Sequence, residues 1–307
     1  MTWGKEAGAV LGVKVLTNVR ADDFFLAAWV QHYGSLFGRE NLHVMLDGDD
    51  WTPQVDLAGV NLHVVRDVPR ERPKRLRFTA VWQSKFANNL LKTGTDVVLR
   101  TDIDEFVAVD PRAGLSLPEY LARLGEGAMC AALGLDVIQG PDEGPLDAAR
   151  PILAQRRNAI LTREYCKLVA VRAPLRWVGG FHRGRQVPID IGPDLLLFHL
   201  ALFDRDVADR RIAGRKTIAE HATQGAHIAG RLDRFAEVAG TSPLNLDTVS
   251  AAARGHVMQS VPSKTGPHPG FIPDGNVKRG YHVRLPDRLA GLLPAPAAFA
   301  PPGFVAA

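Results

Sequence analysis

Three acidic residues follow a short apolar run in the first half of the chain. The sequence from Thr95 to Val109 is TDVVLRTDIDEFVAV, with Asp102, Asp104 and Glu105 between two apolar stretches. Residues two apart share one side of an extended chain, so we expect Asp102 and Asp104 to converge and Glu105 to face away. Converging carboxylates repel each other unless a proton or a cation lies between them. The segment predicts a Mg²⁺ or Mn²⁺ site with positions open for substrate phosphates. The alternative is that the acids only solvate a turn.

Alternating strand and helix patterns surround this acidic segment. Apolar runs predict strands at residues 13–17, 42–46, 60–65, 97–99, 128–138, 167–172 and 195–199. Apolar residues at helical spacing predict helices at residues 21–33, 78–91, 118–124 and 204–221, the first capped by Asp22. This order is typical of α/β proteins with an open sheet, which bind ligands at the carboxyl ends of their strands.

The composition is that of a folded globular protein. The chain has 307 residues, 46% hydrophobic and 23% charged, and a net charge of +4. This charge is too small to indicate nucleic-acid binding but suits an anionic small substrate. Cys130 and Cys166 have no metal-ligand spacing, so we expect a reducing compartment, and a disulfide between them stays open.

The ends of the chain carry two further expectations. The N-terminal sequence mixes acidic and basic residues and is a poor secretory signal, and no apolar stretch approaches the roughly 20 residues of a membrane span. We therefore expect a cytoplasmic protein with at most peripheral contact at the inner face of a membrane. Gly, Pro and Ser become frequent after about residue 240, which predicts a domain at 10–235 and an irregular C-terminal extension at 236–307.

Four motifs, spread over residues 13–216, resemble a known enzyme family. They are Val15-Leu16-Thr17-Asn18-Val19-Arg20 with Trp29-Val30-Gln31-His32-Tyr33; Leu46-Asp47-Gly48-Asp49-Asp50; Leu99-Arg100-Thr101-Asp102-Ile103-Asp104-Glu105-Phe106; and Cys166-Lys167 with Gly180-Phe181-His182 and Leu197-Phe198-His199. Together they resemble the family-2-like nucleotide-sugar glycosyltransferases. This chain has Ala21-Asp22 where the family usually has Asn-Glu.

The resemblance implies a GT-A fold, which is an open mixed sheet, mostly parallel and flanked by helices. It implies a metal-dependent enzyme that transfers a sugar from a nucleoside-diphosphate sugar to a glycan or another hydroxyl acceptor. Asp104 would bind the metal directly, and Asp102 would contact the metal or the ribose. His199 would complete the metal sphere; the alternative is a core histidine that donates to a backbone carbonyl.

Several other residues are predicted to contact the nucleotide or the sugar. The resemblance implies Asn18 and Asp47, although Asp47 before a glycine could simply form a turn. Arg20 lies near a loop at the sheet edge and Lys85 on a flanking helix, so we interpret both as diphosphate or base contacts, with solvated surface charges as the alternative. Lys167 and His182 are further predicted sugar or phosphate contacts.

A general base is needed only if the reaction inverts the anomeric centre, and the sequence leaves the stereochemistry open. Asp136 ends a predicted strand, Asp142 and Glu143 lie in the loop after it, and Asp194 precedes another strand. These four carboxylates are the predicted bases.

Two other functions compete with glycosyl transfer. A Mg²⁺-dependent phosphotransferase of the haloacid-dehalogenase kind also has D-x-D after a buried strand, but usually on its first strand and without Phe at the position of Phe106. A catalytically silent nucleotide- or glycan-binding module is the second alternative, which the altered Ala21-Asp22 pair keeps open. Sequence alone leaves the nucleotide, sugar and acceptor undetermined.

Overall fold

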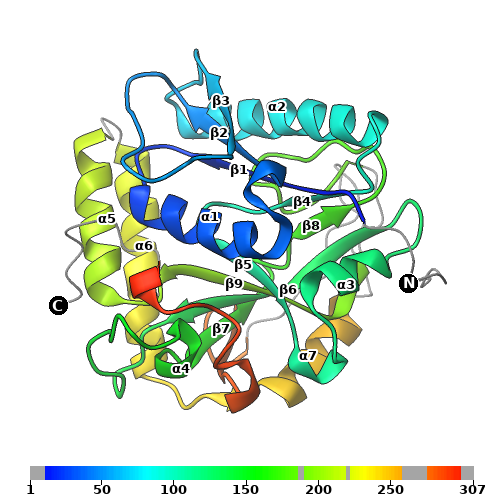
Figure 1. Cartoon of the computed structure of the whole chain (residues 1–307). Helices are drawn as coiled ribbons and strands as arrows, with labels where there is room; N and C mark the ends of the chain where they lie inside the picture. The colour runs from blue at the N-terminus through cyan, green and yellow to red at the C-terminus, as the bar shows by residue number, and fades with distance from the viewer. Residues whose placement is uncertain (1–10, 186–189, 219–221, 258–274, 299–307) are drawn as a thin grey trace.

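The computed structural model describes residues 11–185, 190–218, 222–257 and 275–298 (Figure 1). The strands are β1 (Val13–Val19), β2 (Leu42–Asp47), β3 (Asn61–Val65), β4 (Val97–Arg100), β5 (Glu105–Val109), β6 (Met129–Ile138), β7 (Asn158–Thr162), β8 (Leu168–Val171), β9 (Asp190–Leu202), β10 (Leu244–Asn245) and β11 (Gly280–Arg284). The α-helices are α1 (Asp23–Phe37), α2 (Arg72–Lys92), α3 (Leu117–Ala122), α4 (Ile152–Gln155), α5 (Arg205–Ile218), α6 (Ala222–Ala239) and α7 (Leu246–Val257).

One mixed sheet runs through the fold in the order β10-β11-β7-β6-β8-β4-β1-β2-β3. The first part of the chain forms a parallel unit, in which β1 pairs with β2 and β4, and β2 pairs with β3. The antiparallel pairs are β4 with β8, β8 with β6, β6 with β7 and β7 with β11. Strand β9 leaves this path and pairs with both β5 and β6. The predicted α/β fold with an open mixed sheet and flanking helices is confirmed.

Helices cover the parallel unit on both faces because its strands are apolar on both sides. Val15 and Leu99 belong to the main core with α1, whereas Leu16 and Val98 pack with Ala80 and other residues of α2. Successive residues of a strand point to opposite faces, which explains this division. Figure 1 shows α2 along the upper edge of the molecule and α1 in front of the sheet.

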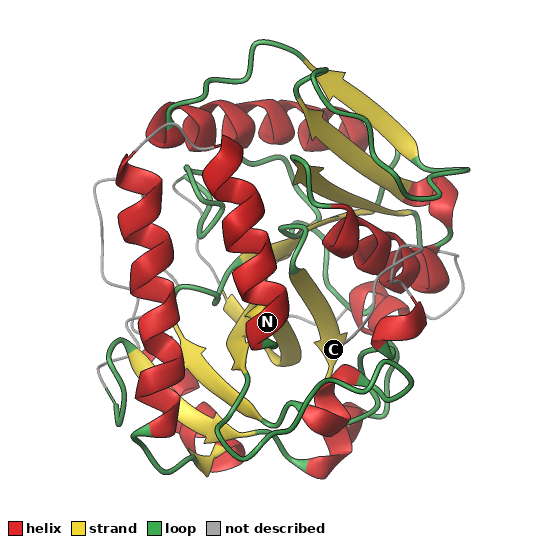
Figure 2. Cartoon of the chain, turned by 90° about the vertical axis from the view of Figure 1, so that its left-hand side faces the viewer, coloured by secondary structure: helices red, strands yellow, loops and turns green. Residues whose placement is uncertain are grey.

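Helices α5 and α6 lie side by side at one flank of the molecule (Figures 1 and 2). Val238 and Phe235 of α6 pack with Ala208 of α5 and with Ile138 and Leu202 at the ends of β6 and β9. The two helices are therefore fixed against the strand ends. Within the described residues, no helix is both long and apolar enough to cross a membrane.

Two predicted segments differ from the structure. The helix predicted at 78–91 begins earlier, at Arg72, because a proline in its first turn has a backbone angle suited to a helix start. The boundary predicted at residue 236 falls inside α6, and β11 joins the main sheet by pairing with β7. The sequence of β11, GYHVR, does not alternate clearly, because the adjacent His282 and Val283 are both buried. Residues 258–274 and 299–307 of the predicted extension lie outside the described residues, and the division into domains stays a prediction.

Candidate active site

Most of the predicted site residues of the first half lie at the carboxyl ends of β1, β2 and β4. Asn18 and Arg20 stand at the end of β1, Asp47 ends β2, and Asp102 lies two residues after β4. Strands β2 and β4 flank β1 on opposite sides, so the chain reverses its direction of winding at β1. Open α/β sheets bind ligands at such a switch point.

A tight turn carries the three acids from β4 into β5. The backbone N–H of Glu105 donates to the carbonyl oxygen of Asp102 at 3.1 Å, and the N–H of Thr101 donates to Leu16 of β1 at 3.1 Å. The indole of Trp29 donates to the Thr101 hydroxyl at 2.9 Å. The chain is therefore turned, not extended, at the acids.

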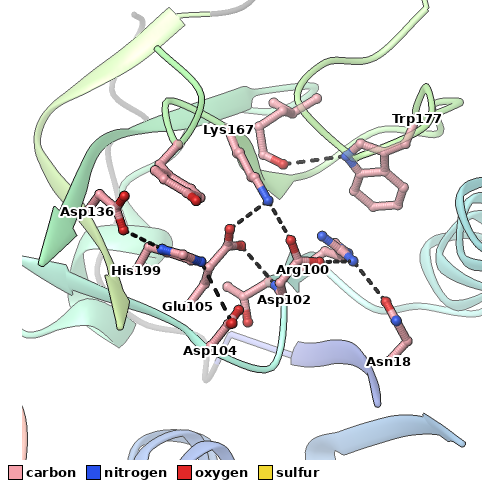
Figure 3. A network of polar contacts seen from close by, with 12 residues as sticks. Asn18, Arg100, Asp102, Asp104, Glu105, Asp136, Lys167, Trp177 and His199 are labelled. Atoms are coloured by element: carbon pink, nitrogen blue, oxygen red, sulfur yellow. Dashed lines mark hydrogen bonds and ion pairs between the residues drawn. The ribbon is translucent and has the colours of Figure 1, made fainter. Parts of the chain in front are cut away.

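Glu105 does not face away from Asp102, which corrects the expectation based on an extended chain. Its Oε2 accepts the backbone N–H of Asp102 at 2.9 Å, and its Oε1 lies 2.6 Å from Nζ of Lys167. The same Nζ donates to Oδ2 of Asp102 at 2.5 Å. Lys167 is buried and joins the two carboxylates (Figure 3). Lys167 thus forms ion pairs with Asp102 and Glu105, and its contact with a ligand stays a prediction.

Arg100 holds the other oxygen of Asp102. Its Nη2 donates to Oδ1 of Asp102 at 2.6 Å and to Oδ1 of Asn18 at 3.0 Å, while its Nε donates to Gln83 at 2.8 Å. The guanidinium carbon lies 3.2 Å from the ring centre of Phe181. Asn18 thus positions Arg100, and Asp102 is held between two cations.

These contacts shift the pKa values in opposite directions. Burial raises the pKa of Asp102, but Arg100 and Lys167 outweigh it and hold the pKa below its ordinary value. Burial and the charge of Asp102 raise the pKa of Glu105. Glu105 is completely buried, whereas the Asp102 side chain is 34% exposed. Asp102 therefore presents the accessible negative charge of this pair.

His199 of β9 stands beside Asp104 and is oriented by Asp136. Its Nδ1 lies 2.6 Å from Oδ1 of Asp136, and Arg231 of α6 donates to its Nε2 at 3.0 Å. Because an arginine has no acceptor, Nε2 accepts, and Nδ1 carries the proton donated to Asp136. Metal-binding histidines typically donate their second N–H to a carboxylate in this way. Strand pairing explains these contacts. His199 of β9 lies opposite Glu105 of β5 on one side and opposite Asp136 of β6 on the other.

Asp104 faces the same space from the other side. Its Oδ2 lies 3.7 Å from Nε2 of His199 and accepts a hydrogen bond from Arg211 of α5 at 3.1 Å. Arg211 also donates to Asp22 at 2.6 Å. Asp22 caps α1 as predicted, by accepting from the N–H of Phe25. The Asp22 that departs from the family motif is thus linked to Asp104.

The structure groups the predicted metal ligands differently from the prediction. Asp104 and His199 face each other, whereas both oxygens of Asp102 are bonded to Arg100 and Lys167. No group of three or more His, Cys, Asp or Glu side chains in the described part of the chain is placed to hold a metal ion. The donor set that fits a divalent cation is one carboxylate and one imidazole, to which substrate phosphates would add ligands.

Arg20 and Asp47 form the part of the site at the end of β2. Arg20 donates to the backbone carbonyl of Asp47 at 2.5 Å and to Asp50 at 2.8 Å. Burial raises the pKa of Asp47, opposed by the nearby Arg75 and Arg20. Asp47 is buried, with a carboxylate 3.9 Å from Arg20. This pair lies at the same edge of the sheet as Asp102.

Three predicted site residues are not brought to this place. Lys85 is exposed and lies two residues from the buried Gln83, so it faces away from the sheet. Glu143 accepts from the backbone N–H groups of Gly140 and Arg157 and holds its own loop. Asp194 lies next to the opposite end of β5, five residues or about 17 Å along β9 from His199. Asp194 precedes the strand predicted at 195–199 and His199 ends it, so the length of the strand separates the two side chains.

Asp136 is placed differently from a general base, whereas the ligand contact of His182 stays a prediction. Asp136 is completely buried behind His199, so it orients the imidazole and is not placed to reach an acceptor hydroxyl. His182 follows Phe181, whose ring contacts Arg100, and is partly exposed. Asp142, the remaining predicted base, pairs with Arg284 at 3.2 Å.

The sequence did not reveal the arginines of α5 and α6. Arg211 binds Asp22 and Asp104, Arg231 contacts His199, and Arg234 lies 3.2 Å from Asp136 and 2.9 Å from Glu164. Charged residues are frequent on both helices and carry no motif. One signal in the sequence is the spacing of Arg231 and Arg234, three residues apart on one helix face.

Helix α1 holds β5 through the residues of the first family-like motif. His32 lies 3.2 Å from the carbonyl of Val107, and the Tyr33 hydroxyl donates to the carbonyl of Glu105 and accepts from the N–H of Val107. Burial lowers the pKa of His32 to about 4, so it is neutral near pH 7. His32 is structural, as predicted. Cys130 and Cys166 are both buried and form no disulfide.

Comparisons with known proteins leave the family open. No family model and no curated protein matches the chain. Among solved structures, the chain is similar to the crystal structure of mannose-1-phosphate geranyltransferase from Thermus thermophilus, at 16% identity over 72% of this chain and 68% of that chain, with a TM-score of 0.27. This similarity is too low to assign a function to the chain.

Proposed function

We propose that the protein is a metal-dependent glycosyltransferase that moves a sugar from a nucleoside-diphosphate sugar to a glycan or another hydroxyl acceptor. The observation that carries the proposal is the pairing of Asp104 with a His199 whose tautomer is set by Asp136. This pair stands at the switch point of an open α/β sheet, where nucleotides bind. The motif resemblance supplies the class of donor.

Asp104 and Nε2 of His199 would hold Mn²⁺ or Mg²⁺. Asp104 supplies the carboxylate oxygen that both ions prefer, and the imidazole nitrogen of His199 suits Mn²⁺ better than Mg²⁺. Mg²⁺ is usually held by one or two carboxylates together with substrate phosphates. A bound cation would neutralise the charge that develops on the leaving diphosphate. Arg211, which now pairs with Asp104, would have to yield this oxygen to the metal.

Asp47 and Arg20 are the proposed nucleoside contacts. A carboxylate accepts from base N–H groups and ribose hydroxyls, and Asp47 is buried at the sheet edge next to the carboxylate turn. Asp102 is the proposed ribose contact, because its side chain is partly exposed and its ion pairs are with Arg100 and Lys167 rather than with groups that bind Asp104. Lys167 and Arg100 then hold Asp102 in place.

The haloacid-dehalogenase alternative receives less support from this geometry. Such an enzyme uses the first aspartate as a nucleophile, and that residue would be Asp102. Both Asp102 oxygens are hydrogen-bonded to cations, which weakens a nucleophile. The strand before it is also the fourth of the chain, with β1, β2 and β3 preceding it.

A silent binding module also receives less support. Its only sequence argument was the altered Ala21-Asp22 pair, and Asp22 is linked through Arg211 to Asp104. Asp22, one of the two residues that differ from the family motif, therefore has a contact with the site through Arg211.

A thermal-shift experiment tests the proposal. The protein would be heated with UDP, GDP or CDP, each with and without Mn²⁺, and the series repeated with Asp104→Ala. A ligand that binds only the folded state raises the melting temperature according to its concentration and affinity. We expect one diphosphate to stabilise the protein by several degrees with Mn²⁺, and this gain to vanish in Asp104→Ala.

The control is Asp142→Ala, which removes an exposed carboxylate paired with Arg284 outside the site. It should respond to the diphosphate like the original protein. Equal stabilisation of Asp104→Ala by the diphosphate and Mn²⁺ would contradict the assignment. Stabilisation by metal alone, with none by any nucleotide, would favour a phosphotransferase.

A further inference from the structure

Arg231 differs from the other cations around the carboxylate turn. Arg211 pairs with Asp22 and Asp104, and Arg234 pairs with Asp136 and Glu164. Arg231 instead donates to the hydroxyl of Tyr165 at 2.7 Å and to Nε2 of His199 at 3.0 Å. Within the described residues, both of its hydrogen bonds therefore go to neutral groups.

Burying a cation next to neutral groups is costly unless an anion compensates it. Arg231 is only partly accessible, and its neighbour Tyr165 is buried with its ring stacked on His199, with the ring centres 3.9 Å apart. The two hydrogen-bond partners of Arg231, Tyr165 and His199, are thus held in place by the stacking of their rings. The charges of Asp136 and Asp104 also act on Arg231. Its hydrogen bonds within the described residues, however, go to a hydroxyl and an imidazole, so an anion that arrives at His199 would exchange places with a neutral partner.

Two further arginines, in the first turn of α2, add positive charge near Arg231. The N-terminal turn of α2 carries Arg72 and Arg75, and the pKa of Arg72 lies below its ordinary value because of burial and the charges of Arg75 and Arg231. The positive charges of Arg72 on α2 and Arg231 on α6 therefore lie close enough to act on each other. Such an arrangement is stabilised by a multivalent anion between them.

We propose that Arg231 binds phosphate oxygens of the donor diphosphate beside the metal position formed by Asp104 and His199. The guanidinium fork matches two oxygens of a phosphate, which a lysine cannot do. The bond to His199 would be exchanged for one to the anion, which frees Nε2 for the metal. This inference rests on the proposed function for the identity of the anion.

Calorimetric titration with inorganic pyrophosphate in the presence of Mn²⁺ tests the inference directly. We expect Arg231→Gln to weaken pyrophosphate binding by about 20-fold or more, the effect of losing one charge-assisted contact. Arg231→Lys keeps the charge and should lose about fivefold. The affinity for Mn²⁺ alone should stay equal or rise, since a cation next to the metal has been removed.

The matched control is Arg279→Gln, which removes an arginine that is 56% exposed and paired with Glu164. It should bind pyrophosphate like the original protein. Unchanged pyrophosphate binding in Arg231→Gln, or no pyrophosphate binding by the original protein, would overturn the inference. If Arg231→Gln does not fold, the test uses Arg231→Lys instead. Pyrophosphate binding by Arg231→Lys equal to that of the original protein would then overturn the inference.

Failure of the proposed function gives a different result. If no nucleoside-diphosphate sugar is turned over but pyrophosphate binding depends on Arg231, the anion site stands and glycosyl transfer fails. If sugar transfer occurs and pyrophosphate binds Arg231→Gln normally, the proposed function stands and Arg231 has no role in binding phosphate.

Discussion

An acid cluster with arginine partners stands at each end of β5, and the two clusters differ in how their charges are satisfied. After the last residue of β5, Asp110 accepts from Arg112 at 2.9 Å and from Arg288 at 2.9 Å. Both arginines also pair with Asp247 of α7, at 3.1 and 2.5 Å. Two carboxylates and two guanidiniums thus form a closed ring of ion pairs.

The cluster at the start of β5 is not closed in this way. Among the described residues, Arg231 donates its hydrogen bonds to a hydroxyl and an imidazole, while Asp136 and Asp104 act on it only through their charge. His199 presents Nε2 toward Asp104. Strands β4, β5 and β9 and helices α5 and α6 meet there, whereas the Asp110 ring ties the C-terminal part of the chain to β5. We therefore interpret a carboxylate–arginine cluster as a ligand site only when one of its arginines has no carboxylate as a hydrogen-bond partner.

The largest stability effect is expected for Lys167→Met. The change would leave Asp102 and the fully buried Glu105 facing each other without the ammonium between them. Removing one member of a buried ion pair costs about 3 kcal/mol of unfolding free energy. Urea unfolding measures this loss. Lys85→Met on the exposed face of α2 is the control and should change stability by less than about 0.5 kcal/mol. A loss below about 1 kcal/mol in Lys167→Met would contradict the assigned ion pairs.

Asp110→Asn tests the ring at the other end of β5. It removes the charge that Arg112 and Arg288 share, so unfolding should become easier by about 2 kcal/mol. The affinity for the nucleoside diphosphate and Mn²⁺ should not change. Urea unfolding and calorimetry measure the two quantities. A parallel loss of nucleotide affinity would mean that the two ends of β5 are not separate.

The stability that the ring of ion pairs adds should depend on pH through the pKa of Asp110. Burial would raise the pKa of Asp110, but hydrogen bonds from Arg288 and Arg112 outweigh it and hold the pKa below its ordinary value. A carboxylate whose pKa is lower in the folded state stabilises the fold above its unfolded pKa of about 3.9, and this stabilisation is lost as the pH falls through the folded pKa. The stability gap between the original protein and Asp110→Asn should therefore narrow below about pH 4. A gap that stays constant down to about pH 3 would argue against the lowered pKa.

The smallest effect is expected for Asp194→Ala. The backbone carbonyl of Asp194 accepts the N–H of Asp110, so the residue belongs to the end of β5 remote from His199. Its side chain should not take part in turnover, and the rate should stay within about twofold of the original. Steady-state release of the nucleoside diphosphate measures this. A large fall in rate would restore Asp194 as a candidate base.

The sequence predicted the local parts of this molecule well. Apolar periodicity located the strands of the parallel unit, and the acids after β4 were predicted at the sheet edge where they lie. Asp22 as a helix cap and His32 as a structural residue are confirmed. These features depend on residues close in the chain or on the strand period, which a sequence displays directly.

Features that depend on distant contacts were not predictable. Glu105 joins Asp102 because the chain turns there and because Lys167, 65 positions after Asp102, bridges them. The separation between Arg211 and Asp22 along the chain is 189 residues. Asp194 precedes the strand predicted at 195–199, but β9 extends from Asp190 to Leu202 and pairs antiparallel with β5, which places Asp194 beside Asp110. A periodicity pattern does not reveal pairing partners.

The most direct test compares turnover in Asp104→Asn and Asp110→Asn, one change at each end of β5. The assay follows release of the nucleoside diphosphate from its sugar donor at saturating Mn²⁺, below the melting temperature of both variants. We predict a fall of about 100-fold or more for Asp104→Asn, since the metal loses its carboxylate, and no more than about a threefold change for Asp110→Asn. Equal rates in the two variants would contradict the claim that the start of β5 is the catalytic centre.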